Sequence, residues 1–110
     1  MQRYELARVA AEQKHSGKVY LEFLRLPGLS MGLYALPAGG RDPQQPHTED
    51  EVYYVVAGQA EMMVGDESQP VGPGSIVSVA AGVPHRFHSI AEELKILVVF
   101  APAEYSQAPR

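Results

Sequence analysis

The stretch that decides the fold runs from Gly39 to Gly58 and reads GGRDPQQPHTEDEVYYVVAG. It begins as a polar loop interrupted by proline and changes into a run of β-branched and aromatic residues that ends at Gly58. His47, Glu49 and Glu51 are spaced two residues apart, so on an extended chain their side chains would point to the same face. An imidazole and two carboxylates on one face, beside an apolar strand, are typical of a metal site.

The composition excludes several classes of protein. The chain has 110 residues, the size of one domain, and 45% of them are hydrophobic, which is enough for a packed core. The net charge is −4 without any clustered basic stretch, which disfavours binding to nucleic acid or to a membrane surface. The absence of cysteine removes disulfides, thiolate zinc sites and cysteine nucleophiles. No stretch has the apolar length of a signal peptide or a membrane span, so we expect a cytoplasmic protein.

Short β-type segments separated by glycine or proline fill most of the chain. The strands that this pattern predicts are 18–26, 29–36, 51–57, 60–64, 68–72, 75–81, 86–90 and 94–100. Many short strands with such turns favour an all-β sandwich or barrel over alternating strands and helices.

The two ends of the chain are expected to differ from this barrel. Apolar spacing in residues 5–13 predicts one short helix that stops near Gly17. The tail has two prolines and little to bury, so we expect it to be loosely held. The predicted organisation is therefore one domain over 1–110, with a helical segment (1–17), a β-barrel (18–100) and a loose tail (101–110).

A spaced motif in the opening stretch makes the chain resemble the cupin superfamily, in its small single-domain form. The first cupin motif reads Gly, five residues, His-x-His, three or four residues, Glu, six residues, Gly. Gly39, His47, Glu51 and Gly58 fall at those offsets, and Gln45 holds the place of the first histidine.

A second cupin motif follows farther along the chain. It reads Gly, five residues, Pro-x-Gly, two residues, His, three residues, Asn. Gly74, Gly82 and His85 match it, while Ala80 replaces the proline and Ser89 replaces the asparagine. The resemblance implies an all-β fold, a double-stranded β-helix or jelly-roll barrel, with metal ligands lining its mouth.

The resemblance also implies a ligand set, because cupins commonly bind one divalent transition metal ion through three histidines and a glutamate. This sequence keeps His47, Glu51 and His85, and the fourth position is open to Gln45, Glu49 or water. Two imidazoles and a carboxylate suit Zn²⁺, Fe²⁺ or Mn²⁺, and a second carboxylate would shift the preference toward Mn²⁺.

The function expected from these residues is a metal-dependent enzyme for a small organic molecule, either an oxygenase or an isomerase or lyase. Tyr53 and Glu49 share the face of Glu51, so either could act as an acid or a base. The alternative is a non-catalytic module that binds metal or a small ligand as a sensor, which the missing first histidine favours. We also expect a homodimer, because the barrel is small, segment 94–100 is apolar on both faces, and small cupins commonly pair.

Overall fold

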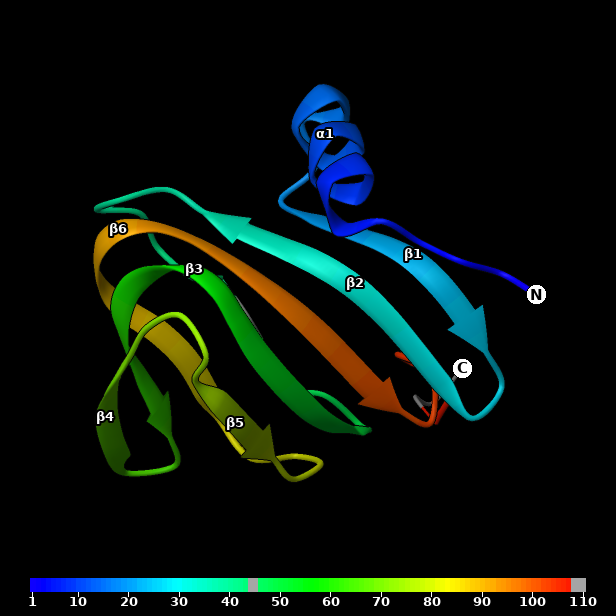
Figure 1. Ribbon diagram of the computed structural model, residues 1–110. Helices are drawn as coiled ribbons and strands as arrows, with labels where there is room; N and C mark the ends of the chain where they lie inside the picture. The colour runs from blue at the N-terminus through cyan, green and yellow to red at the C-terminus, as the bar shows by residue number, and fades with distance from the viewer. Residues whose placement is uncertain (44–45, 108–110) are drawn as a thin grey trace.

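The architecture is antiparallel β-sheet with one short helix (Figure 1). The computed structural model describes residues 1–43 and 46–107. Within them lie α1 (Leu6–Ser16), β1 (Tyr20–Leu26), β2 (Leu29–Leu36), β3 (Asp50–Val64), β4 (Glu67–Val71), β5 (Ile76–Val79) and β6 (His85–Ala101). The helix ends at Gly17, whose φ of 71° is left-handed, and the sequence predicts this stop. No helix in the described ranges is long and apolar enough to cross a membrane.

The strands form one continuous sheet that folds over on itself. Its order is β1-β2-β6-β3-β4, and β5 also pairs with β3. The two long strands run antiparallel, from Asp50 opposite Ala101 to Val64 opposite His85, with register shifts between residues 55 and 61. Both strands bend sharply in this middle region (Figure 1). Their two halves therefore belong to two facing layers, and the space between the layers is the interior of the barrel.

The bend explains why the structure has fewer strands than the sequence predicts. The breaks expected at Gly58 and at residues 91–93 are bends inside β3 and β6 rather than turns between strands. Gly58 has a φ of 101°, and a Cβ at this position would lie 2.3 Å from the carbonyl oxygen of Glu93. The glycine thus lets the two backbones approach each other at the bend, and pairing resumes beyond it.

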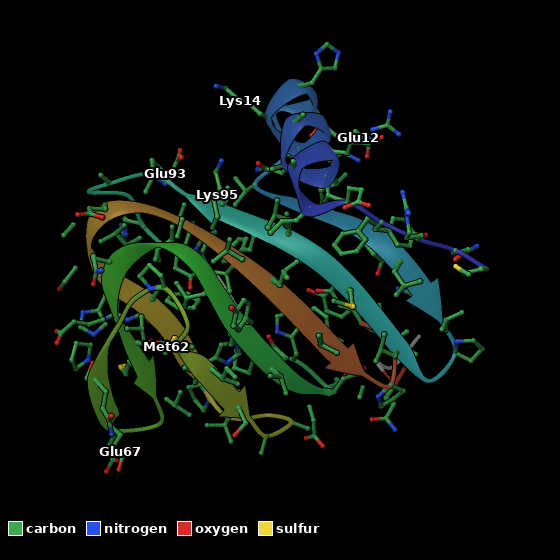
Figure 2. The ribbon with its side chains drawn as sticks, viewed as in Figure 1. Glu12, Lys14, Met62, Glu67, Glu93 and Lys95 are labelled. Carbon is green, nitrogen blue, oxygen red and sulfur yellow. The ribbon has the colours of Figure 1, made fainter. Side chains whose placement is uncertain are left out.

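The core lies between the two layers and is built by alternation along the strands. Its buried apolar residues are Tyr34, Leu36, Tyr53, Val55, Ala60, Met62, Val71, Val79, Phe87, Ile90, Leu94, Ile96, Val98 and Phe100. In Figure 2 the labelled Glu12 and Lys14 lie on opposite sides of α1, and both are exposed. Met62, also labelled there, is 3% exposed. At one end of the interior the inward-facing residues are polar rather than apolar, and this end holds the candidate site.

Candidate metal centre

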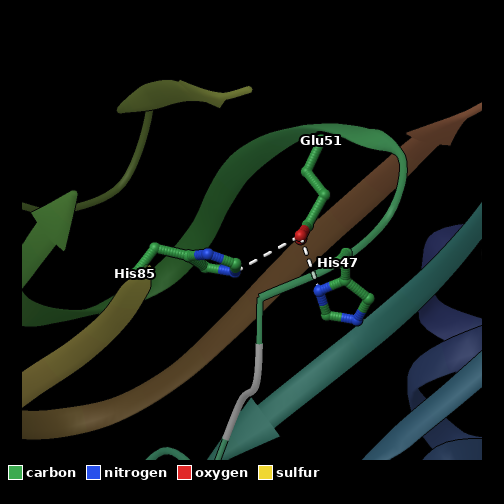
Figure 3. Close-up of side chains that lie close together, drawn as sticks. All are labelled: His47, Glu51 and His85. Carbon is green, nitrogen blue, oxygen red and sulfur yellow. Dashed lines mark ion pairs between the residues drawn. The ribbon is translucent and has the colours of Figure 1, made fainter. Parts of the chain in front are cut away.

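Three side chains that the sequence predicts as metal ligands converge at one end of the barrel (Figure 3). Glu51 Oε1 lies 2.7 Å from His47 Nδ1 and 3.3 Å from His85 Nε2. One ligand atom from each residue lies within 4.8 Å of the others. The three residues are at most 7% exposed, so the group is shielded from bulk water.

The fold brings these residues together from distant parts of the chain. His47 and Glu51 lie on the buried side of one alternating segment, in the loop before β3 and at the start of β3. His85 is the first residue of β6 and pairs with Val64 at the opposite end of β3. Because both long strands bend, His85 returns across the interior and faces Glu51 from the other layer (Figure 3).

The donor set fits a divalent transition ion. His47 Nδ1 is buried and has no hydrogen-bond partner among the residues that the structure describes, although Glu51 Oε1 is 2.7 Å away. Two imidazole nitrogens and one carboxylate oxygen that meet in a buried site match the ligand preferences of Zn²⁺, Fe²⁺ and Mn²⁺.

The electrostatics of the group are those of closely packed acids and bases. Burial acts to raise the pKa of Glu51, but its close contacts with His47, His85 and Tyr53 hold it at about 2. Burial acts to lower the pKa of His47, but its contacts with Glu104 and Glu51 raise it to about 9. Without a metal ion, the site at neutral pH therefore holds an ionised Glu51 beside a protonated His47. A metal ion bound by His47 would have to displace that proton.

The remaining predicted site residues lie around this group. The Tyr53 hydroxyl donates a hydrogen bond to Glu51 Oε2, which orients the carboxylate. Tyr53 is fully buried, as expected for a residue two positions from Glu51 on the same face of the strand. Gln45, predicted as a possible fourth ligand, lies outside the residues that the structure describes.

Glu49 shares a face with His47 and Glu51, but its carboxylate binds the C-terminal tail instead of joining their group. It is 1% exposed, and its carboxylate accepts backbone N–H groups of Tyr105 at 2.6 Å and of Gln107 at 3.1 Å. The hydroxyl of Thr48 also donates to it. Glu49 does not belong to the converging group of possible ligands. The role of Glu49 as a ligand, acid or base stays a prediction, whereas its hydrogen bonds to the tail are observed in the structure.

The tail makes specific contacts with the site, in contrast to the loosely held segment that the sequence predicts. Ala103 is 2% exposed, and the N–H of Glu104 donates to Ser30 Oγ at 2.9 Å. Glu104 Oε2 lies 3.0 Å from His47 Nε2. The ring of Tyr105 stacks on that of His47, with centroids 5.4 Å apart. Sequence reasoning missed Glu104 because no motif spacing leads to it.

A cavity of about 370 Å³ opens beside His47. Its lining consists of Tyr20, Tyr34, Pro43, His47, Val98, Phe100, Glu104 and Tyr105. The hydroxyl of Tyr34 donates to Asp42, whereas the buried hydroxyl of Tyr20 has no hydrogen-bond partner within the described ranges. Burial raises the pKa of both phenols, so both are neutral hydrogen-bond donors. A cavity of about 410 Å³ between β4 and β5 contains none of the candidate ligands.

Fold and site together define a double-stranded β-helix with a His–Glu–His group at one end. The family model of the cupin domain matches residues 32–100, and the chain therefore belongs to the cupin family. An uncharacterized protein of Streptomyces coelicolor is 50% identical over 104 residues, which are 94% of this chain and 99% of that relative. The dimethylsulfoniopropionate lyase DddQ of Ruegeria pomeroyi is 33% identical over 66 residues, which are 59% of this chain and 33% of DddQ.

Solved structures confirm the predicted fold. The protein TT1209 from Thermus thermophilus has a TM-score of 0.73 at 28% identity, over 94% of this chain and 99% of that chain. An RmlC-like cupin family protein with a double-stranded β-helix fold from Methanocaldococcus jannaschii has a TM-score of 0.69 at 22% identity. That similarity covers 77% of this chain and 80% of the other.

Proposed function

We propose that this protein is a metal-dependent enzyme that acts on a small organic molecule in the cavity beside His47. The observation that carries the proposal is the buried convergence of His47, Glu51 and His85 at the edge of this cavity. The similarity to a lyase, DddQ, supports an enzymatic cupin. Because the sequence match covers only a third of DddQ, the substrate of DddQ is not transferred to this chain.

In this proposal His47, Glu51 and His85 hold one Zn²⁺, Mn²⁺ or Fe²⁺ ion, with the fourth position left to Gln45, Glu49 or water. When bound, such an ion supplies Lewis-acid polarisation of a substrate oxygen or, in the case of iron, chemistry with O₂. These alternatives correspond to an isomerase or lyase and to an oxygenase.

The other residues of the cavity bind and orient the substrate. Val98 and Phe100 provide an apolar wall that excludes water, and the Tyr20 hydroxyl can donate a hydrogen bond to a carbonyl or carboxylate oxygen. Tyr53 stays a candidate acid, but its hydroxyl proton is engaged by Glu51. The cavity thus suits a molecule with an apolar part and at least one hydrogen-bond acceptor.

Elemental analysis of protein purified without chelator and without added metal tests this proposal. We expect about one equivalent of a transition metal, and its loss in the double variant His47→Ala with His85→Ala. The matched control is His15→Ala with His88→Ala, since both of those histidines lie outside the converging group. Wild-type protein without stoichiometric metal, or a double variant that keeps it, would contradict the proposal.

A non-catalytic metal or ligand-binding module is the second candidate, and one observation favours it. Gln45 stands where the cupin motif has its first histidine, so the ligand set has one imidazole fewer than usual. Metal-loaded protein that turns over no member of a panel of oxidisable and isomerisable compounds would favour this candidate. Retention of one small molecule through purification, detected by mass spectrometry, would favour it further.

We also propose that the protein forms a homodimer. The outer face of the sheet exposes Val52, Tyr54 and Ile76, which are 40%, 44% and 70% exposed. Tyr54 and Ile76 are paired neighbours on β3 and β5, so these side chains form a continuous apolar surface. Sedimentation at micromolar concentrations should give twice the monomer mass, and a monomer mass throughout would exclude the dimer. A cytoplasmic location stays a prediction.

A further inference from the structure

We propose that the C-terminal tail, residues 102–107, is part of the metal centre and that it acts through Glu104. In this role Glu104 is a positioning residue, because its carboxylate orients the imidazole of His47 as a ligand. The inference rests on the proposed function, since it requires that His47 binds a metal ion.

The two nitrogens of His47 face two different carboxylates. Nε2 lies 3.0 Å from Glu104 Oε2, while Nδ1 lies 2.7 Å from Glu51 Oε1 on the side of the converging group. A neutral imidazole that donates its Nε2–H to a carboxylate keeps its lone pair on Nδ1. Nδ1 is also the buried nitrogen without a hydrogen-bond partner among the described residues. Glu104 therefore selects the tautomer that presents a ligand atom to the metal site.

Glu104 acts through His47 rather than as a ligand itself. The residues whose donor atoms lie within 4.8 Å of one another are His47, Glu51 and His85, and Glu104 is not one of them. Its side chain is 15% exposed, so the contact with His47 is largely shielded from water. Carboxylates that hold the outer nitrogen of a ligating histidine fix the ring and raise its basicity.

The position of Glu104 is fixed by anchors on both sides of its backbone. Its N–H donates to Ser30 Oγ, which is fully buried, and its carbonyl oxygen accepts from the Arg25 guanidinium at 2.9 Å. The next N–H, that of Tyr105, donates to the buried carboxylate of Glu49. A buried carboxylate that accepts two backbone N–H groups of the tail is a specific anchor for it. The tail is thus held where Glu104 reaches His47.

Two aromatic rings complete the arrangement. The His47 ring lies 4.7 Å from the centroid of Phe100 and 5.4 Å from that of Tyr105. The ring of Tyr105 is inclined by only 27° to the imidazole and stacks on it. Phe100 and Tyr105 limit the tilt of the imidazole, and Glu104 decides which nitrogen carries the proton.

The test measures Zn²⁺ affinity by competition with a chromophoric chelator, with wild-type protein and the variants Glu104→Ala and Glu104→Gln. We expect Glu104→Ala to weaken Zn²⁺ binding about 10- to 100-fold. Glu104→Gln should fall between Glu104→Ala and wild type, because its amide oxygen accepts the hydrogen bond without the negative charge. The control, Glu12→Gln, removes an exposed carboxylate on α1 and should bind Zn²⁺ as wild type does. Unchanged affinity in both Glu104 variants would overturn the inference.

This outcome is distinguishable from failure of the proposed function. If wild-type protein binds no Zn²⁺, the proposed metal site is wrong. If wild-type protein binds Zn²⁺ and both Glu104 variants bind it equally well, the metal site is supported and the proposed role of the tail is wrong. Nitrogen-15 NMR of Zn²⁺-loaded wild-type protein gives a readout that does not depend on how the variants fold. It should show His47 protonated at Nε2, and protonation at Nδ1 would exclude the proposed role.

Discussion

The carboxylate of Glu49 accepts the backbone N–H of Tyr105 at 2.6 Å, across 56 residues of sequence. This hydrogen bond joins the loop that carries His47 to the tail that carries Glu104. Burial acts to raise the pKa of Glu49, but the bonds from Thr48, Tyr105 and Gln107 lower it, so the anchoring group is a carboxylate at neutral pH. This buried acid thus holds the C-terminal segment against the loop, together with the hydrogen bonds of Glu104 to Ser30 and Arg25.

Replacement of Glu49 by alanine should release the tail. The N–H groups of Tyr105 and Gln107 lose their acceptor, and we expect the free energy of unfolding to fall by about 1–3 kcal/mol. Hydrogen exchange of these two amides should accelerate, while amides in the middle of β6 keep their protection. The control is Glu92→Ala, which removes an exposed carboxylate. Unaltered exchange at Tyr105 would show that Glu49 does not hold the tail.

The sequence predicted that the described site residues His47, Glu49, Glu51 and Tyr53 share one face, because that depends only on local periodicity. Residues 47, 49, 51, 53 and 55 are all buried, as alternation along an extended chain requires. The partner of each buried residue was not predictable in the same way. Glu49 and Glu51 share a face, but one contacts the tail and the other the two histidines, and this difference arises from long-range packing.

The strand breaks show the same division between local and long-range information. A glycine with its permissive backbone is compatible with a turn and equally with a bend inside a strand. Gly65 lies at a turn between β3 and β4, whereas Gly58 lies inside β3. Only the close approach of the Glu93 backbone, which belongs to a distant part of the sequence, separates the two cases.

Substitution of these two glycines by alanine should therefore have unequal effects. A Cβ at Gly58 would meet the Glu93 carbonyl oxygen at 2.3 Å in addition to an unfavourable φ, so we expect a loss of about 3 kcal/mol or more. Gly65 has a φ of 61° but open space around it, so alanine there should cost about 1 kcal/mol. Urea unfolding of both variants measures the difference. Equal losses would mean that the bend does not depend on this backbone approach.

The two tyrosines of the cavity should respond differently to removal of their hydroxyl groups. Tyr34→Phe breaks the hydrogen bond to the carboxylate of Asp42, and we expect a loss of about 1.5–3 kcal/mol in the free energy of unfolding. Tyr20→Phe removes a buried hydroxyl that has no partner in the described ranges, so stability should be unchanged or slightly higher. Chemical denaturation of the two variants measures the change in the free energy of unfolding for each. A large loss in Tyr20→Phe would reveal a partner for its hydroxyl within the folded chain.

The metal-free protein should lose stability as the pH rises through the range in which His47 titrates. The pKa of His47 is about 9 in the folded protein against an ordinary value of 6.5, so its stabilising effect is complete below about pH 6.5 and is lost toward pH 9. The pKa of Glu51 is about 2 against an ordinary value of 4.5, so its effect is present above about pH 4.5 and is lost toward pH 2. These two groups together predict greatest stability between about pH 4.5 and 6.5.

Unfolding by urea from about pH 2 to 10, in the presence of chelator, measures this profile. His47→Gln should flatten its alkaline side, because glutamine has no proton to lose. Metal should reverse the trend, since an ion bound to His47 replaces the proton and its affinity rises as that proton becomes easier to remove. A metal-free protein equally stable at pH 6.5 and pH 9 would show that the carboxylates of Glu51 and Glu104 do not hold a proton on His47. The proposed competition between proton and metal at that ring would then have no basis.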